Sequence, residues 1–598
     1  MKDSPIYEDV SHLLKRSSII FLLVEIVFLF VAFYYWKIQI LDYKKYWTLS
    51  EANRTREAVI PAPRAVLTDR SGSVVLANSV ASFRASIIRE NTKNFDESCR
   101  KIGQLLGLEE AIIRERMDKY KSLPVFKPIV VKDNLTLEEV SRIEGRKMDM
   151  PELVIETEPK RFYPFTTLAA HIIGCVQELT MDELRTTFKE RKLGDMAGKT
   201  GVESSYESRL AGVDGKIIEV VDSLGRKRDE LDRIEPQQSP KLALTLDYDI
   251  QAKAEELLTG KEGAIVVLEP KTGEVLALAS FPTYDPNKFV NRFTPEEWMA
   301  LANNPDNPLV NRAIQGQYSP GSIFKLAMAS GALDSGTIVD QTTFFCGGSI
   351  QIYGRPFRCW FEPGHGTLNL YEAIQHSCNI YFYNLGRRMN IDTIARYAEE
   401  LGLGKKTGID IPGEKEGLVP STEWKKKTQK TAWYPGETIS VAIGQGPLQV
   451  TPLQVAAMTA LIANRGARIY PHVLREGREP AENIKITSAI FEKIIEGMWR
   501  SANMGGTGQG ARVDKFDVCS KTGSTQIIGR ETAEKLGTQR KTHSWFTGFA
   551  PRNNPRVVVT VLVEFGGLGG ATAAPIAGEI FKLYKNKFYD RQSSSPGD

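Results

Sequence analysis

The sequence predicts a multidomain α/β (α+β) protein with a single transmembrane helix near its N-terminus. Its 598 residues are enough for two to four domains, and 42% hydrophobic with 25% charged residues is ordinary for a globular protein. One apolar run is long enough to span a bilayer. In the C-terminal half, short β-branched strands lie at both ends of a largely helical stretch, which predicts one domain whose sheet joins distant segments. A net charge of +4 gives no indication of nucleic-acid binding.

The transmembrane helix is predicted at residues 19–40, where Glu25 is the one charge inside the apolar run. A charge at that depth more often marks a contact with another membrane helix than a lipid-facing position. No small-residue cleavage pattern follows, so we expect an uncleaved anchor, although a buried helix of a soluble protein gives a similar pattern. Residues 1–18 would then form a cytoplasmic tail. The flanking lysines and arginines do not settle the orientation, and the chemistry described below places the bulk of the chain outside the cytoplasm.

Residues 41–235 are predicted to form a non-catalytic module of mixed α/β structure, because no catalytic constellation is found there. A charged helix is expected to leave the membrane over residues 41–60 and to break at Pro61. Residues 65–77 then read as a strand, a tight turn and a second strand.

Three charged residues accompany this hairpin, namely Arg64, Asp69 and Arg70. They could form a buried ion-pair network, and the alternative is an ordinary solvated hairpin. The spacing alone does not decide between these two interpretations.

A second domain is predicted over residues 236–590, because a polar, proline-containing linker precedes it at residues 233–241. Residues 591–598 are expected to be a disordered tail. The elements expected in the domain are a strand at 242–246, a helix at 249–258, a hairpin formed by 264–268 and 275–279, and a strand at 557–564.

A possible nucleophile lies in the turn Ser319-Pro320-Gly321, which is followed by Ser322 and, three residues on, by Lys325 at the start of an apolar helical run. Residues three apart on a helix share a face, so the hydroxyl and the amine can meet. A hydroxyl becomes a strong nucleophile when a nearby base takes its proton, and a buried lysine with a lowered pKa can be that base. Taken alone, the pattern is as well explained by a helix start with a surface lysine.

Two further motifs make a catalytic interpretation much stronger. Ser377-Cys378-Asn379 follows an apolar segment, and Lys521-Thr522-Gly523-Ser524 reads as a strand at the edge of a sheet. The order Ser-x-x-Lys, Ser-x-Asn, Lys-Thr-Gly matches a known signature of class A β-lactamases and penicillin-binding proteins.

On these motifs the chain resembles the class B penicillin-binding proteins. The resemblance extends from the anchor through the Arg64 hairpin and Gly201-Val202-Glu203 to Gly444-Gln445-Gly446 and Trp545 to Ala550. It implies an elongated pedestal of the dimerisation type and a transpeptidase domain whose antiparallel sheet is flanked by helices. It also implies a serine D-Ala-D-Ala transpeptidase that crosslinks peptidoglycan stem peptides, is acylated by β-lactams and resides in the inner membrane with its catalytic domain on the periplasmic side. The chain length and the loop at residues 353–366 are similar to the elongation-type branch, and the division-type branch is the alternative.

The resemblance implies a role for each catalytic residue. Ser322 would attack the penultimate D-Ala carbonyl, and Lys325 would be its base. Lys521 would keep Lys325 neutral and attract the terminal carboxylate of the substrate. Ser377 would pass a proton to the leaving amine, and Asn379 would orient Lys325 and a substrate amide.

The residues that would bind the substrate lie on the third motif. Thr522 and Ser524 can hydrogen-bond the carboxylate or the peptide backbone, and Gly523 lets the substrate approach the strand. The backbone N–H groups of Ser322 and Ser524 would form the oxyanion hole.

Other function classes remain as alternatives. A class A β-lactamase is much shorter and needs a deacylating glutamate, and a bifunctional enzyme needs an acidic glycosyltransferase motif that residues 45–235 lack. We therefore expect a separate membrane glycan polymerase of the rod-elongation machinery as partner. A scaffold that activates such a polymerase, or a β-lactam sensor, is the non-enzymatic alternative.

Three of the six cysteines cluster with a histidine in the sequence, in the order Cys346, Cys359, His365, Cys378. Three thiols and an imidazole suit tetrahedral Zn²⁺, and such a site would be structural because it leaves no coordination position open. A disulfide between Cys346 and Cys359 is the alternative in an oxidising compartment, and unrelated buried thiols are a third interpretation. The other cysteines, Cys99, Cys175 and Cys519, are expected to be small buried residues.

Overall fold

The chain is described here by a computed structural model that covers residues 11–192, 194–222, 227–291, 293–476, 483–526 and 542–590. Its residues form two compact units, and each is built from segments that are distant in the sequence. Unit one comprises residues 1–62, 82–158 and 213–237, and unit two comprises residues 63–81, 159–212 and 238–598. The expected disordered tail at 591–598 and the first ten residues of the expected cytoplasmic tail lie outside the described residues.

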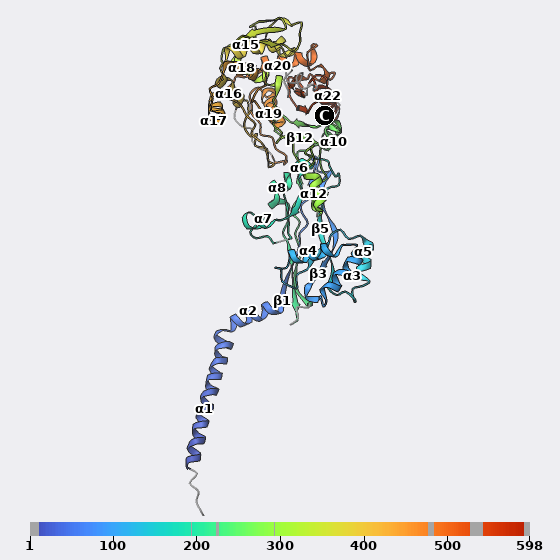
Figure 1. Ribbon diagram of the computed structural model, residues 1–598, viewed down its shortest axis with the longest axis vertical. Helices are drawn as coiled ribbons and strands as arrows, with labels where there is room; N and C mark the ends of the chain where they lie inside the picture. Colours follow the sequence, from blue (N-terminus) through green and yellow to red (C-terminus); the bar gives the residue numbers. More distant parts are fainter. Residues whose placement is uncertain are drawn as a thin grey trace, which may run out of the picture. The chain divides into compact units, whose positions relative to one another are not determined.

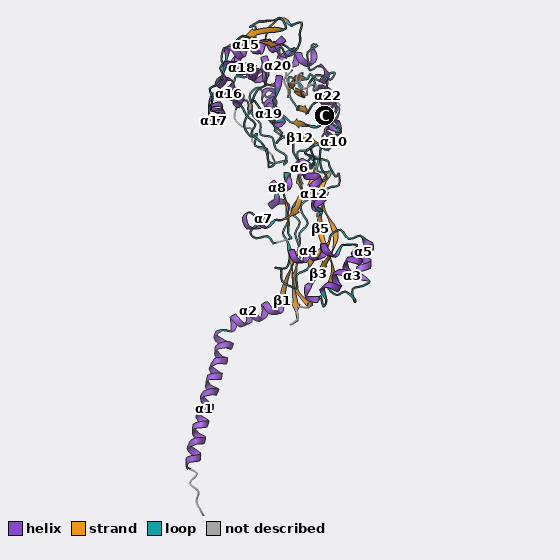
Figure 2. Ribbon diagram, in the orientation of Figure 1, coloured by secondary structure: helices purple, strands orange, loops and turns teal. Residues whose placement is uncertain are grey.

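Unit one begins with α1 (Ser11–Trp36), which a single π-helical turn, η1 (Lys37–Leu41), extends. The segment Leu14–Leu41 has a mean hydropathy of 2.5 and is the one helix in the described part of the chain that is long and apolar enough to cross a membrane. Its side chains are exposed, as a lipid-facing helix requires. Figure 2 shows it as one continuous helix.

The charged segment after the anchor is only partly helical. After Asp42 the chain turns away from the axis of α1 and forms α2 (Tyr43–Arg54), as Figure 1 shows. The expected helix up to residue 60 is wrong at its end, because Thr55–Ile60 form strand β1. This strand pairs antiparallel with β8 (Gly215–Val221), and the sequence TREAVI alternates between half-buried and exposed side chains from Arg56 on. Tertiary pairing therefore overrides the helical tendency of the charged residues.

The rest of unit one is a mixed α/β layer. The strand order β1-β8-β9 makes one sheet, and the second half of β3 pairs with β4 and β5. Helix α3 packs on α4 and α5, and α4 contacts β4. The remaining elements are β9 (Lys227–Ile234), β3 (Val75–Ile87), η2 (Arg89–Asn91), α3 (Phe95–Leu106), α4 (Glu110–Lys119), β4 (Ile129–Lys132), α5 (Leu137–Glu144) and β5 (Leu153–Phe162).

In unit two, β2 (Leu67–Thr68) and the start of β3 form the expected antiparallel hairpin, which confirms that prediction. The charged residues beside it do not pair with one another. Arg64 binds Glu203 and Glu207, whereas Arg70 binds Glu274 and Asp69 accepts bonds within its own turn. The predicted network thus exists around Arg64, but its acids come from the short helices α8 (Gly201–Ser205) and α9 (Glu207–Leu210).

The catalytic half of unit two is built on a five-stranded antiparallel sheet in the order β12-β11-β19-β18-β17. The expected hairpin is formed by β11 (Gly263–Leu268) and β12 (Val275–Phe281), and the late strand is β19 (Val557–Val563). Both faces of the sheet are covered: alternate residues of β11 enter a core with α19 (Pro452–Ala463) on one side and with α10 (Tyr248–Leu258) and α22 (Ala573–Tyr584) on the other. The fold class is therefore as predicted.

The third motif occupies β17 (Cys519–Gln526), which is the last strand of this sheet and pairs with β18 (Thr542–Ala550). Helix α20 (Ser488–Asn503) packs against it.

The other elements of unit two connect these layers. They are β10 (Leu242–Ala243), α6 (Ala170–Ile173), β6 (Val176–Glu178), α7 (Met181–Thr186), β7 (Met196–Gly198), α11 (Asn287–Val290), α12 (Pro295–Ala302), η3 (Gly321–Phe324), α13 (Lys325–Asp334), β13 (Phe344–Cys346), β14 (Ser349–Ile352), β15 (Arg355–Arg358), β16 (Gly366–Leu368), α14 (Leu370–Gln375), α15 (Asn379–Arg388), α16 (Ile391–Glu400), α17 (Thr422–Gln429), α18 (Pro435–Val441), η4 (Gln509–Ala511) and η5 (Lys585–Tyr589).

Candidate active site

Ser322 lies in the short 3-10 helix η3, which is held firmly against the sheet. The carbonyl of Ser319, just before η3, accepts hydrogen bonds from Thr525 Oγ1 (2.8 Å) and Trp545 Nε1 (3.2 Å). The Gly321 N–H donates to the Gly444 carbonyl at 3.0 Å, and a Cβ at position 444 would lie only 2.0 Å from the Gly321 oxygen. This close approach fixes the position of the segment that carries Ser322.

Lys325 opens α13 and is completely buried. Its ammonium group donates to the Ser377 carbonyl at 2.8 Å, to Asn379 Oδ1 at 2.8 Å and to Ser377 Oγ at 3.3 Å. Burial away from water lowers the pKa of Lys325 to about 8. A substantial fraction of this amine is therefore neutral near physiological pH, as a general base requires.

Lys521 approaches the same hydroxyl from the strand side. Its Nζ donates to Ser377 Oγ at 2.8 Å and to the Thr522 carbonyl at 2.9 Å. Burial, and secondly the neighbouring charge of Lys325, lower the pKa of Lys521 well below its usual value. The three motifs therefore meet in one buried polar network, with Ser377 Oγ between two lysine amines.

The structure brings together most of the predicted catalytic residues, but one expected contact is not formed. Within the described residues the Ser322 hydroxyl makes no hydrogen bond, and Ser322 is half-buried. The geometry of η3 and α13 places Ser322 one turn before Lys325, so both belong to the same side of this segment.

The predicted substrate-binding residues lie along β17. Thr522 Oγ1 donates to Thr507 Oγ1 at 2.7 Å, and Ser524 Oγ accepts from the Gly569 N–H at 3.0 Å. A Cβ on Gly523 would lie 2.9 Å from the Pro320 carbonyl, so a side chain there would press against the turn before Ser322.

The contacts of Thr507 and Gly569 were not expected from the sequence. Thr507 lies in the glycine-rich run GGTGQG at 505–510, and Gly569 in the run GGLGG at 566–570. Such runs indicate close backbone packing, and this signal was present in the sequence. It does not reveal which strand the loops approach, because that information comes only from the fold.

The four predicted metal ligands are also brought together. The ligand atoms of Cys346, Cys359, His365 and Cys378 all lie within 4.8 Å of one another. His365 Nδ1 is 3.6 Å from Cys346 Sγ and 3.5 Å from Cys359 Sγ. A zinc tetrahedron with ordinary Zn–S and Zn–N bond lengths has an S···N edge of about 3.6 Å, so the donor set fits this metal.

The thiols of Cys359 and Cys378 share a hydrogen bond that shifts their pKa values in opposite directions, lowering that of Cys359 and raising that of Cys378. A hydrogen bond from Cys378 is the largest cause that lowers the pKa of Cys359, to about 4. A thiolate is the form of cysteine that binds metals. All six cysteines are described and all are free thiols, so Cys346 and Cys359 are not joined by a disulfide in this structure.

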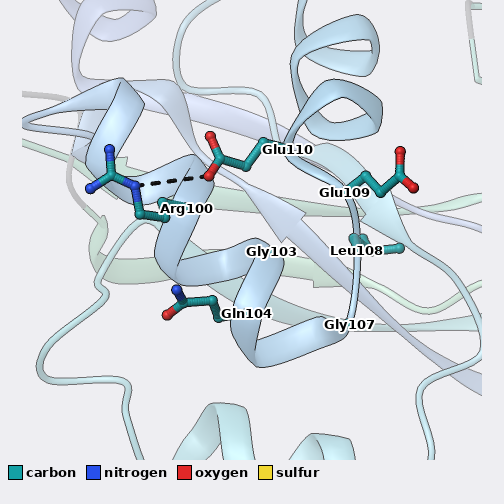
Figure 3. A pocket seen from close by; sticks show the side chains of 7 residues that line it. All are labelled: Arg100, Gly103, Gln104, Gly107, Leu108, Glu109 and Glu110. Atoms are coloured by element: carbon teal, nitrogen blue, oxygen red, sulfur yellow. Dashed lines mark ion pairs between the residues drawn. The ribbon is translucent and has the colours of Figure 1, made fainter.

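A depression of about 370 Å³ lies on unit one, where α3 ends and α4 begins (Figure 3). It is lined by Arg100, Gly103, Gln104, Gly107, Leu108, Glu109 and Glu110. Arg100 and Glu110 face each other across it with an N···O distance of 3.8 Å. None of the predicted site residues lines it, and its side chains offer no nucleophile.

Comparison with known protein families gives two matches that together cover most of the chain. Residues 263–582 match the penicillin binding protein transpeptidase domain, and residues 59–244 match the penicillin-binding protein dimerisation domain. The first match contains all three catalytic motifs.

Curated proteins with similar sequences include the peptidoglycan D,D-transpeptidases MrdA of Acinetobacter baumannii and Escherichia coli K12. The first is 36% identical over 581 residues, which covers 94% of this chain and 86% of that protein. The second is 33% identical over 567 residues, which covers 90% of this chain and 88% of that protein.

Solved structures give the same result for the fold. The penicillin-binding protein PBP2 of Helicobacter pylori, in complex with MreC, superposes with a TM-score of 0.82 at 29% identity, covering 90% of this chain and all of that one. A chain from a peptidoglycan synthase complex that coordinates polymerization and crosslinking superposes with a TM-score of 0.71 at 29% identity, covering 96% of this chain and 98% of that one.

Proposed function

This chain belongs to the class B penicillin-binding proteins, the family that includes the peptidoglycan D,D-transpeptidases, and we propose that it acts through an acyl-enzyme on Ser322. In this reaction it crosslinks peptidoglycan stem peptides. The chain is a serine-type transpeptidase and a β-lactam target of the elongation type, like the MrdA proteins. The observation that carries the proposal is the buried contact of all three motifs at Ser377 Oγ.

In the first half-reaction, Ser322 Oγ attacks the carbonyl carbon of the penultimate D-Ala of a donor stem peptide. Neutral Lys325 takes the hydroxyl proton, the carbonyl oxygen becomes an oxyanion, and the N–H groups of Ser322 and Ser524 stabilise it. The C–N bond then breaks, and Ser377 supplies a proton to the departing D-Ala amine, since Lys521 can replace that proton. An ester on Ser322 remains.

In the second half-reaction, the amine of a neighbouring stem peptide attacks the ester carbonyl. Ser377 accepts the proton that this amine loses and passes its own proton to Lys521, which gave one up in the first step. The C–O bond breaks, and the protonated Lys325 returns a proton to Ser322. The third motif holds the terminal carboxylate of the donor through the hydroxyls of Thr522 and Ser524 during the first step, and the Lys521 amine lies beside Thr522.

Labelling with a fluorescent penicillin tests this function directly. We expect the full-length protein to form a covalent adduct and Ser322→Ala to form none, because the acylated oxygen is absent. Ser335→Ala, which changes an exposed serine at the end of α13, is the matched control and should label like the wild type. Normal labelling of Ser322→Ala would disprove the assignment.

The sequence also allows a division-type enzyme or a scaffold that activates a glycan polymerase. The match to the MrdA proteins favours elongation. A cell that keeps its rod shape when Ser322→Ala replaces the wild-type protein would favour a scaffold, whereas loss of both penicillin labelling and shape supports the enzyme.

The partners and location follow from the same relatives. One helix among the described residues is long enough to span a bilayer, which supports a single-pass anchor in the inner membrane with the catalytic domain on the periplasmic side. The limits 41–235 for the pedestal and 236–590 for the transpeptidase domain stay a proposal, and the compact units differ from them because residues 63–81 and 159–212 belong to unit two. The relatives in complex with MreC and in a peptidoglycan synthase complex support corresponding partners here, including a separate membrane glycan polymerase.

A structural zinc ion is part of the proposal, with Cys346, Cys359, His365 and Cys378 as ligands. The compact cluster of donor atoms and the matching S···N distances support it. Bound there, the metal would attach the segment from β13 to β16 to Cys378. Cys378 is the residue between Ser377 and Asn379. Metal analysis together with a thiol count tests this: one zinc per chain supports the site, and no metal with two thiols missing until reduction favours the disulfide.

A further inference from the structure

The end of strand β15 is attached directly to the second catalytic motif. The Arg358 carbonyl accepts hydrogen bonds from Asn379 Nδ2 and from the Tyr383 hydroxyl, each at 3.4 Å. Two residues later, Trp360 Nε1 donates to the His376 carbonyl at 2.9 Å. The short segment from Arg358 to Trp360 is therefore fixed to residues on both sides of Ser377.

Two side chains of this segment, those of Arg358 and Trp360, remain available to a ligand, whereas Cys359 between them is buried in the cysteine cluster. Arg358 is exposed, and the Trp360 indole is 52% exposed although its one polar atom is already bonded. The opposite face of β15 is used for packing, because Phe357 meets the Tyr383 ring at 5.3 Å.

Among the described residues Arg358 forms no ion pair. The Trp360 ring meets the His365 ring at 5.6 Å and the Phe361 ring at 5.8 Å but stays half-exposed, so an unpaired positive charge and a partly covered aromatic ring lie beside the active site.

In the proposed mechanism the donor stem peptide lies next to the segment from Arg358 to Trp360. Asn379 is the residue proposed to orient a substrate amide, and its own amide donates to the backbone carbonyl of Arg358, so the Arg358 side chain starts next to that amide. Stem peptides carry free carboxylates upstream of their D-Ala-D-Ala end. A guanidinium group recognises a carboxylate with two parallel hydrogen bonds, which gives geometric selectivity as well as affinity.

We propose that Arg358, together with the exposed face of Trp360, forms a subsite for the donor stem peptide, in which Arg358 binds a carboxylate upstream of the scissile D-Ala-D-Ala bond. Trp360 covers the methyl and methylene groups of the same stretch of peptide. The inference rests on the proposed function and adds a specificity for acidic over amidated donors.

Two synthetic pentapeptide donors test the subsite with the full-length protein. Both end in D-Ala-D-Ala, and they differ only in whether the upstream acidic residue carries a free carboxylate or a carboxamide. The measured quantity is the peptide concentration that halves the rate of penicillin labelling of Ser322. The labelling rate without peptide reports independently that the active site is intact.

The wild type should favour the acidic donor by about threefold to tenfold, the range expected for a partly exposed charge-assisted pair, and added salt should reduce this preference. Arg358→Ala should bring the ratio of the two donors to about one while labelling without peptide stays normal. Arg355→Ala is the matched control, because Arg355 is an exposed arginine at the other end of β15, and it should keep the preference.

If the wild type labels normally but both donors inhibit it equally, the subsite is wrong and the proposed function stands. The same holds if Arg358→Ala keeps the preference, or if Arg355→Ala loses it equally. A wild-type protein that acquires no penicillin label would overturn the proposed function and the subsite with it.

Discussion

At the scale of single residues, the central group is the hydroxyl of Ser377. A hydroxyl offers one donor and two acceptor sites, and here both lysine amines point at its oxygen. With its acceptor sites occupied, the hydroxyl proton is left for a substrate atom, which suits a donor to the leaving amine. The residue also has a φ of 52°, a left-handed conformation that costs a non-glycine residue about 1–3 kcal/mol. Such a cost is typical of functional positions.

The lowered pKa of Lys325 gives a pH dependence. Acylation requires the neutral amine of Lys325, whose pKa is about 8. The second-order rate of penicillin labelling should therefore rise as the pH is raised through about 8. With an ordinary lysine as the base, the same rise would come about two pH units higher. Labelling rates between pH 6 and 9.5 check this. A rate that is constant over this range would remove Lys325 as the base.

At the scale of elements, the position of η3 depends on two glycines that meet. Gly444→Ala would place a methyl group 2.0 Å from the Gly321 carbonyl and so displace the segment that carries Ser322. A shift of about 1 Å at a reacting group can reduce the rate about 100-fold, and we expect a loss of labelling of that order.

Gly446→Ala is a matched control for this change. Gly446 has a φ of +77°, close to the +76° of Gly444, so both substitutions carry the same backbone strain. A Cβ at position 446 meets nothing closer than 3.8 Å. An equal loss of labelling in both variants would show that strain, and not the contact with η3, causes the effect.

The proposed zinc ion would attach the loop that carries Cys346, Cys359 and His365 to the second catalytic motif. Cys378→Ser should remove one zinc per chain, lower the melting temperature and slow penicillin labelling, because Ser377 and Asn379 flank the altered ligand. Cys99→Ser, at a buried cysteine of unit one, should keep both the metal and the labelling rate. Unchanged metal content, stability and labelling in Cys378→Ser would disprove the zinc site.

At the scale of the whole molecule, the buried charges of unit two join segments that are distant in the sequence. Glu203 is fully buried and binds Arg64 Nη2 at 2.6 Å and Arg161 Nε at 2.5 Å. Burial alone would raise the pKa of Glu203, but the charges of Arg161 and Arg64 hold it below its usual value. The carboxylate therefore stays ionised between the two guanidinium groups.

Loss of this charge should destabilise unit two. Glu203→Gln leaves Arg161 buried without a counter-charge, and removal of one partner of a buried ion pair costs about 3–5 kcal/mol. The midpoint of urea unfolding, followed by tryptophan fluorescence, should fall clearly. Glu207→Gln, at the partly exposed edge of the cluster, should have a smaller effect, and equal shifts would contradict the central role of Glu203.

Much of this architecture could be predicted from the sequence, because the signals are local or match a known pattern. The anchor, the hairpin of β11 and β12 and the three motifs belong to this class. The partners of Arg64 could not be predicted, since Glu203 is 139 residues away and only the fold brings it near. The strand at residues 55–60 was missed for the same reason, and the left-handed Ser377 has no sequence signal at all.

The position of β17 at the end of its sheet has a consequence for solubility. A terminal strand offers unpaired N–H and C=O groups to any other extended chain, and such edges promote aggregation. An enzyme that admits an extended peptide beside β17 cannot simply cover that edge. In the proposed function Lys521, an amine buried within the strand, would oppose the docking of an apolar strand and accept a partner with a carboxylate, so one side chain would both discourage aggregation and select the peptide.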